Sequence, residues 1–175
     1  METKVIFATS NQGKMREIRA ILADLDLEVF SMKESGMDLN IVEDGATFEE
    51  NARIKARAVY EEAGKRGEAP LVLADDSGLV IDYLNGEPGV YSARYMREDI
   101  SYEIKNREII KRLEKAEGQE RSARFVSVIA AVFPDGTEKT VEGTVEGLIV
   151  FLLFRVTILT LLLQSYGLFS LQSHP

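Results

Sequence analysis

Short apolar runs alternate along the chain with amphipathic segments, and this pattern predicts an α/β fold. The apolar runs are rich in β-branched and aromatic residues, which is typical of strands. Pro134-Asp135-Gly136 separates two of them as a hairpin turn. Ile41-Val42 has the composition to extend another strand. The predicted strands cover residues 4–9, 27–31, 71–76, 79–84, 123–133 and 137–145.

Apolar residues at helical spacing predict three helices between these strands. The first covers residues 13–25 after an N-cap at Ser10-Asn11, and the second runs from a capping box at Thr47 to about residue 63. The third covers residues 101–116. Strands that alternate with helices, plus one hairpin, predict a mixed central β-sheet flanked by helices. The expected buried positions are Met15, Ile18, Ile21 and Leu22, then Ala52, Ala56, Val59 and Ala63, then Ile104, Ile109, Ile110 and Leu113.

Two adjacent carboxylates, Asp75 and Asp76, follow an apolar run and precede an expected break at Ser77-Gly78. Open α/β sheets place their ligands at the carboxyl ends of strands. Like charges side by side are unfavourable unless a cation or proton offsets them, so the pair is a candidate metal-dependent site. The alternative is a solvated turn, since Asp, Ser and Gly are common turn residues. In an extended strand the two side chains would point to opposite faces.

The first strand runs into the first helix at a small polar turn, which is a candidate anion site. Helix N-terminal amides and the helix dipole favour an anion there. Lys14 lies in the first turn, where a cation is disfavoured, and this suggests an anion held jointly by Lys14 and the amides. An exposed surface lysine is the alternative. Lys55 and Arg57 of the second helix either reach the site or solvate a helix face.

The composition of the chain limits the catalytic groups and the binding partners that can be expected. The chain has 175 residues, which suits one domain, and its net charge of −8 argues against a general affinity for DNA or RNA. It has no cysteine, and its one histidine is His174, so thiol, Ser-His and histidine-rich metal chemistry are disfavoured. Carboxylates are left as the acid and base groups. The N-terminal segment is too polar for a signal peptide, and we expect a cytoplasmic protein.

Four patches, in this order and spacing, resemble the inosine triphosphate pyrophosphatases, also described as dITP/XTP pyrophosphatases. The resemblance covers about residues 4–147. The patches are Thr9-Ser10-Asn11-Gln12-Gly13-Lys14, Glu43 to Ala52 (EDGATFEENA) with Lys55-Ala56, Ala74-Asp75-Asp76-Ser77-Gly78 and Pro88-Gly89-Val90-Tyr91-Ser92-Ala93-Arg94-Tyr95.

The resemblance implies a dimeric, cytosolic, magnesium-dependent hydrolase of nucleotide metabolism. Its expected substrates are non-standard purine nucleoside triphosphates (ITP, dITP and XTP), cleaved to the monophosphate and pyrophosphate by attack of water on the α-phosphate. Glu43 and Asp76 are expected to bind Mg²⁺, with Asp75 as a further candidate, and Asp76 to be the base that activates water. The expected substrate-binding residues are Thr9, Ser10, Asn11, Gln12, Gly13, Lys14, Lys55 and Ser77.

The last part of the chain departs from the family. After Gly147 the base-recognition signatures of the family are missing, and residues 148–163 are almost wholly apolar. We therefore divide the chain into an α/β domain at 1–147 and a tail at 148–175. A membrane anchor and buried strands are alternatives, but the abrupt change favours a shift of reading frame near residue 148. The alternative function is an inactive or membrane-tethered nucleotide-binding remnant.

Overall fold

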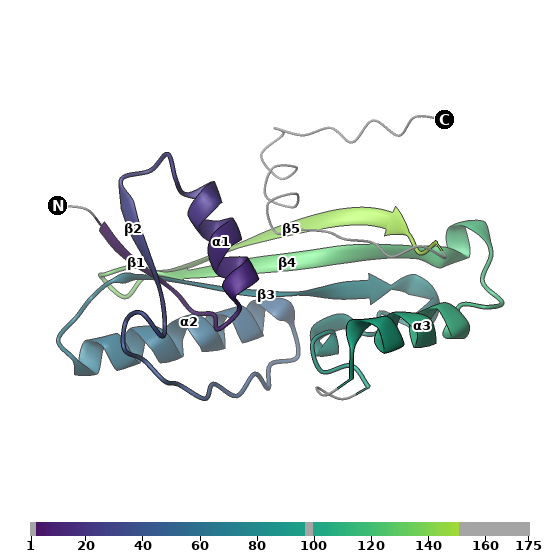
Figure 1. Ribbon diagram of the computed structural model, residues 1–175, viewed down its shortest axis with the longest axis horizontal. Helices are drawn as coiled ribbons and strands as arrows, with labels where there is room; N and C mark the ends of the chain where they lie inside the picture. Colours follow the sequence, from purple (N-terminus) through teal and green to yellow (C-terminus); the bar gives the residue numbers. More distant parts are fainter. Residues whose placement is uncertain (1–2, 97–99, 151–175) are drawn as a thin grey trace.

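The computed structural model describes residues 3–96 and 100–150. A five-stranded sheet with the order β2-β1-β3-β4-β5 forms its centre (Figure 1). β1 pairs in parallel with both β2 and β3, whereas β3, β4 and β5 pair antiparallel. The predicted mixed α/β sheet is therefore confirmed. The strands are β1 (Thr3–Phe7), β2 (Leu27–Ser31), β3 (Leu71–Ile81), β4 (Ser122–Val132) and β5 (Glu138–Leu148).

Three α-helices within the described residues connect or flank the strands, and two of them begin at the predicted caps. Asn11 caps α1, and its side chain accepts hydrogen bonds from the amides of Gly13 and Lys14. Thr47 and Glu50 form the capping box of α2. The helices are α1 (Gln12–Ile21), α2 (Phe48–Lys65) and α3 (Tyr102–Arg112), with short 3₁₀ helices η1 (Asp82–Leu84), η2 (Gly89–Tyr91) and η3 (Gly118–Arg121).

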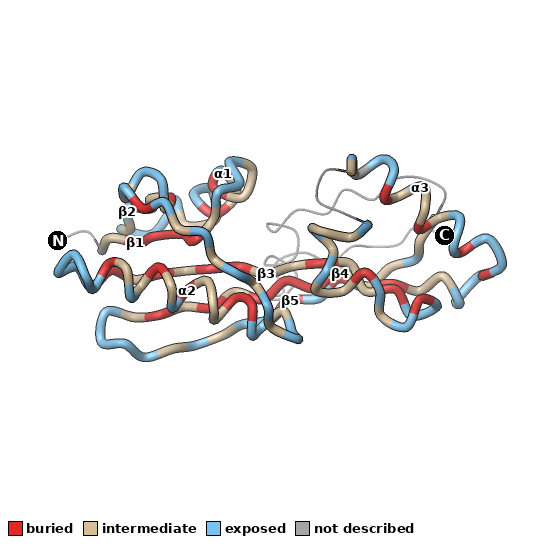
Figure 2. Tube along the Cα trace, turned by 90° about the horizontal axis from the view of Figure 1, so that it is seen from below, coloured by how far each residue is buried: buried red, intermediate tan, exposed pale blue. Residues whose placement is uncertain are grey.

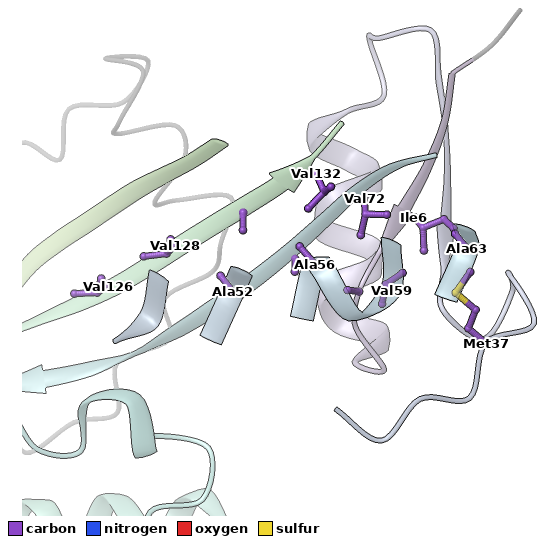
Figure 3. Packing of buried hydrophobic residues seen from close by; sticks show 13 residues of the cluster. Ile6, Met37, Ala52, Ala56, Val59, Ala63, Val72, Val126, Val128 and Val132 are labelled. Atoms are coloured by element: carbon purple, nitrogen blue, oxygen red, sulfur yellow. The ribbon is translucent and has the colours of Figure 1, made fainter. Parts of the chain in front are cut away.

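The main hydrophobic core lies between α2 and one face of the sheet (Figure 3). α2 presents the predicted small residues, among them Ala52 and Ala56, which are fully buried. They face Val72 of β3 and Val128 of β4. Because alanine side chains are short, the helix approaches the sheet closely, and the polar residues beside them are brought against β3.

α1 packs on the opposite face, where Met15 and Ile18 contact Phe7. α3 covers the far part of the long β3–β4–β5 ribbon, through Ile109 and Leu113. In Figure 2, α1 and α3 lie at opposite ends of the same side of the sheet. Ile104 is 48% exposed, so its predicted burial is wrong.

Lys105, the residue after Ile104 in α3, is buried instead. Its ammonium donates a hydrogen bond to the carbonyl of Ala93 at 2.6 Å. Lysine reaches a backbone carbonyl through its long apolar stem, which hydropathy alone does not show.

Three strand predictions are wrong, and one of them is the strand predicted at residues 79–84, since residues 82–84 form η1. β3 is one strand from Leu71 to Ile81 and does not break at Ser77-Gly78. Gly78 is needed there for space, because a Cβ would lie 2.5 Å from the carbonyl oxygen of Gly89 and would also meet Ser92 Oγ. Ile41-Val42 belongs to a loop and forms no strand.

The predicted boundary at residue 147 falls inside β5, which ends at Leu148. Beyond it, the Ile149 amide donates to the carbonyl of Arg121 at 2.9 Å. Residues 151–175, which hold most of the apolar tail, lie outside the described residues, so the frame shift and its alternatives stay predictions. No helix in the described ranges has the length and apolar character to cross a bilayer.

Two glycine-to-alanine substitutions are expected to change the free energy of unfolding in opposite directions. Gly78→Ala forces a methyl group into the backbone of η2 and should lower the free energy of unfolding by about 1–3 kcal/mol. Gly64→Ala, in α2, meets no atom within 4 Å and should raise it by about 0.4–1 kcal/mol. Urea unfolding of both variants checks this, and equal effects would contradict the close approach at Gly78.

Candidate active site

A cavity of about 1000 Å³ lies where β1 ends and β3 continues. β1 pairs with β3 only as far as Leu73, so the next residues of β3 have no β1 neighbour at their edge. Residues from both faces of β3, including Asp75 and Asp76, line this one cavity. The first turn of α1 lines one side, and α3 contributes Ile109 from the other. The cavity therefore gathers groups from both sides of the sheet.

Asp75 faces α1 and is neutralised there. It is 2% exposed, and its carboxylate forms an ion pair with the ammonium of Lys14. The same ammonium lies 3.5 Å from Ser77 Oγ, two residues along the strand and on the same face. A buried carboxylate needs such a partner, because an unpaired charge in the interior is costly. Lys14 is therefore a member of the site and not an isolated surface lysine.

Asp76 faces α2 and has different partners. Asn51 Nδ2 donates to Asp76 Oδ2 at 3.1 Å, and Lys55 Nζ lies 3.7 Å from Asp76 Oδ1. The same Lys55 ammonium donates to Glu43 Oε2 at 2.8 Å. Two carboxylates thus approach one cationic group. The predicted split of Asp75 and Asp76 between the two faces is confirmed, and Lys55 reaches the site.

Burial raises the pKa of Asp76 above its ordinary value. The positive charge of Lys55 and the hydrogen bond from Asn51 act in the opposite direction, whereas the nearby charge of Glu43 raises the pKa further. The net rise makes Asp76 a better proton acceptor than an exposed aspartate.

The turn before α1, where the sequence predicted an anion site, lies partly at the cavity. Thr9, Ser10, Asn11 and Lys14 line the cavity, but Gln12 and Gly13 do not. Asn11 Oδ1 accepts from the amides of Gly13 and Lys14 at 2.8 and 3.3 Å. These amides are therefore already satisfied, and an anion that used them would take the place of the asparagine side chain.

The loop that carries Glu43 is held by two residues to which the sequence analysis gave no role. Arg94 Nη2 donates to the Glu43 carbonyl at 2.8 Å, and Asn51 Oδ1 accepts from the Gly45 amide at 2.9 Å. Both residues lie within the four family-like patches, which was the available signal. Arg57 instead pairs with Glu138, so it stabilises a surface and does not enter the site.

In the described ranges, no group of three or more acidic or histidine side chains is arranged to hold a metal ion. The arrangement most similar to a metal site is the pair of carboxylates, Glu43 and Asp76, that both approach Lys55. Asp75 is not part of this pair, because it forms an ion pair with Lys14.

Comparison with known proteins identifies the family. The model of the Ham1 family matches residues 5–152. The chain belongs to the Ham1 family. A dITP/XTP pyrophosphatase of Bacillus licheniformis is 47% identical over 146 residues, which cover 83% of this chain and 72% of that protein. One from Clostridium perfringens is 43% identical over 147 residues, covering 83% and 72%.

Solved Ham1 structures share the fold. The Staphylococcus aureus Ham1 protein superposes with a TM-score of 0.72 at 38% identity, over 85% of this chain and 72% of that one. A Ham1 protein from Coxiella burnetii gives 0.74 at 34% identity, over 84% and 73%. The resemblance inferred from the four patches is thus confirmed. The roles of the individual site residues stay predictions.

Removal of the Asp76 charge should change how stability depends on pH. Burial raises the folded-state pKa of Asp76 above the unfolded-state value, so the parent chain loses stability as pH rises through that interval. Asp76→Asn lacks this loss. At each pH, the stability of the variant is compared with that of the parent. We expect this difference to favour the variant more at about pH 7 than at about pH 4. Urea unfolding in a chelating buffer measures both differences, and equal differences would contradict the raised pKa.

Proposed function

We propose that this chain hydrolyses non-standard purine nucleoside triphosphates, such as ITP, dITP and XTP, to the monophosphate and pyrophosphate. One observation carries the proposal: the carboxylates of Glu43 and Asp76 converge on one cationic position in the same cavity as Lys14 and the start of α1. That arrangement supplies a base, a cation position and an anion-binding turn. The names of the relatives, dITP/XTP pyrophosphatases, support this substrate class.

The donor set suits Mg²⁺. Mg²⁺ prefers oxygen ligands and is commonly bound by one or two carboxylates together with substrate phosphates. Glu43 and Asp76 already share the ammonium of Lys55, so the position between them is suited to positive charge. These two residues would hold the ion, which when bound neutralises charge on the phosphate oxygens. Asp75 is compensated by Lys14, and we assign it to that lysine and not to the metal.

Asp76 is the proposed general base. It accepts a proton from the attacking water at its carboxylate, and its raised pKa favours this step. The water oxygen bonds to the α-phosphorus as the bond to the bridging oxygen breaks, and that oxygen leaves with pyrophosphate. Lys14 and Ser77 lie on the Asp75 face of β3 and would bind the phosphates with Thr9, Ser10 and Asn11.

We assign two successive roles to Lys55 in this mechanism. It compensates Glu43 and Asp76 in the free chain, and its ammonium can turn to a phosphate once another cation takes its place. The amides of Gly13 and Lys14 become available if the substrate displaces Asn11 Oδ1. Assembly as a homodimer, a cytoplasmic location and the lack of affinity for DNA or RNA are further parts of the proposal.

The test is pyrophosphate release from dITP, XTP, dTTP and ATP with Mg²⁺. We expect the chain to release pyrophosphate from dITP and XTP, and we expect Asp76→Asn to lower kcat by at least about 100-fold because it removes the base. Circular dichroism and thermal unfolding show whether the variant keeps its fold. A folded Asp76→Asn variant of nearly full activity would overturn the proposal. Equal rates with ATP would show that the purine selectivity is lost together with the signatures that are missing after Gly147. No release by the parent chain would favour the inactive nucleotide-binding remnant.

A further inference from the structure

Asn51 lies in the first turn of α2 and is almost completely buried, at 1% exposure. A buried amide group is costly unless its donors and acceptor find partners. Its neighbours in α2 pack against the sheet, and Lys55 lies one helical turn further on, on the same side of the helix. The close packing of α2 therefore holds the Asn51 side chain against β3, next to Asp76.

Both ends of the Asn51 amide are used, and they bind two different parts of the site. Nδ2 donates to Asp76 Oδ2 at 3.1 Å, and Oδ1 accepts from the Gly45 amide at 2.9 Å. A carboxylate only accepts and a backbone N–H only donates, so these partners fix which way the amide faces. One planar group thus ties Asp76 of β3 to the loop that carries Glu43.

The loop lies directly against this amide. A Cβ on Gly45 would be 2.8 Å from Asn51 Oδ1 and 2.7 Å from Glu50 Cβ, so only glycine fits at this distance. Arg94 holds the Glu43 carbonyl at 2.8 Å from the other side. Arg94 and Asn51 therefore both hold the backbone around Glu43, and of these two only Asn51 also touches Asp76.

We propose that Asn51 is a positioning residue that sets the spacing and orientation of Glu43 and Asp76 for a divalent cation. The inference rests on the proposed function, because that function assigns the two carboxylates to Mg²⁺. Asn51 acts through these two residues and does not itself contact the substrate. An aspartate here would keep the acceptor for Gly45 but would turn a second carboxylate toward Asp76. A leucine of similar size would offer neither bond.

The neighbouring Glu50 provides a matched control. Its carboxylate accepts from the amides of Ala46 and Thr47, at 2.6 and 3.3 Å, and so holds the same loop at the next residues. It has no hydrogen bond to Asp76 in the described structure. A purely structural contribution at the start of α2 would thus be lost in Glu50→Ala as well, whereas the link to Asp76 is lost only at Asn51.

The experiment compares Asn51→Leu, Asn51→Asp and Glu50→Ala with the parent. Partners of metal ligands typically contribute about 10–100-fold to metal affinity or activity. We expect both Asn51 variants to lower kcat for dITP by about 10–100-fold with little change in KM, because the phosphate-binding residues on the other face of β3 are untouched. Glu50→Ala should keep kcat close to that of the parent, even if its thermal unfolding midpoint falls as far as the midpoints of the Asn51 variants.

A second readout does not depend on turnover. Mn²⁺ binding to the nucleotide-free chain, followed by electron paramagnetic resonance, should weaken by about 10-fold or more in Asn51→Leu and remain near the parent value in Glu50→Ala. If the parent releases no pyrophosphate, the proposed function fails while this comparison still tests Asn51. Equal losses in Asn51→Leu and Glu50→Ala, or parent-like kcat in Asn51→Asp, would overturn the positioning role.

Discussion

Charge compensation on the two faces of β3 is the constraint on which the site depends. Asp75 and Asp76 are adjacent in sequence, so the pleat of the strand sends one toward α1 and the other toward α2. Lys14 neutralises the first, and Lys55 shares its charge between the second and Glu43. Two carboxylates that would repel each other in a turn are therefore kept apart by the backbone. This separation lets Asp75 hold Lys14, the proposed phosphate-binding lysine, while Asp76 stays available for its proposed roles as metal ligand and base.

The fold brings these pairs together through two unrelated features. β1 stops at Phe7, which leaves the edge of β3 open to the cavity beyond Leu73. α2 approaches the sheet on its alanine face, which places Lys55 and Asn51 against Asp76. The proposed cation position thus lies between a helix and a strand that pack against each other in the main core. By contrast, Glu43 comes from a loop and needs Arg94 and Asn51 to hold it.

Local chemistry made much of this predictable from the sequence. The caps at Asn11 and Thr47 were predictable because side chains bond amides a few residues away, and the opposed directions of Asp75 and Asp76 follow from the pleat alone. Gly78 was misjudged because glycine also serves where distant backbone comes close, and η2 lies ten or more residues further on.

The other misses depend on contacts between segments that are far apart in the chain. Nothing local distinguishes the buried Lys105 from a surface lysine, because its partner is the carbonyl of Ala93. The sequence assigned no role to Asn51, because its contacts appear only when Gly45 and Asp76 are placed on either side of it. Sequence patterns therefore predicted the elements and the charged groups better than the pairings among them.

The division of the two carboxylates predicts that Lys14 acts with Asp75 and independently of Asp76. A double-mutant cycle on dITP binding, measured by calorimetry in a chelating buffer that suppresses turnover, tests it most directly. Lys14→Met and Asp75→Asn should be non-additive by at least about 0.5 kcal/mol, whereas Lys14→Met and Asp76→Asn should add to within about 0.5 kcal/mol. Additivity between Lys14 and Asp75, or equal coupling of Lys14 to both aspartates, would contradict the division of the two carboxylates.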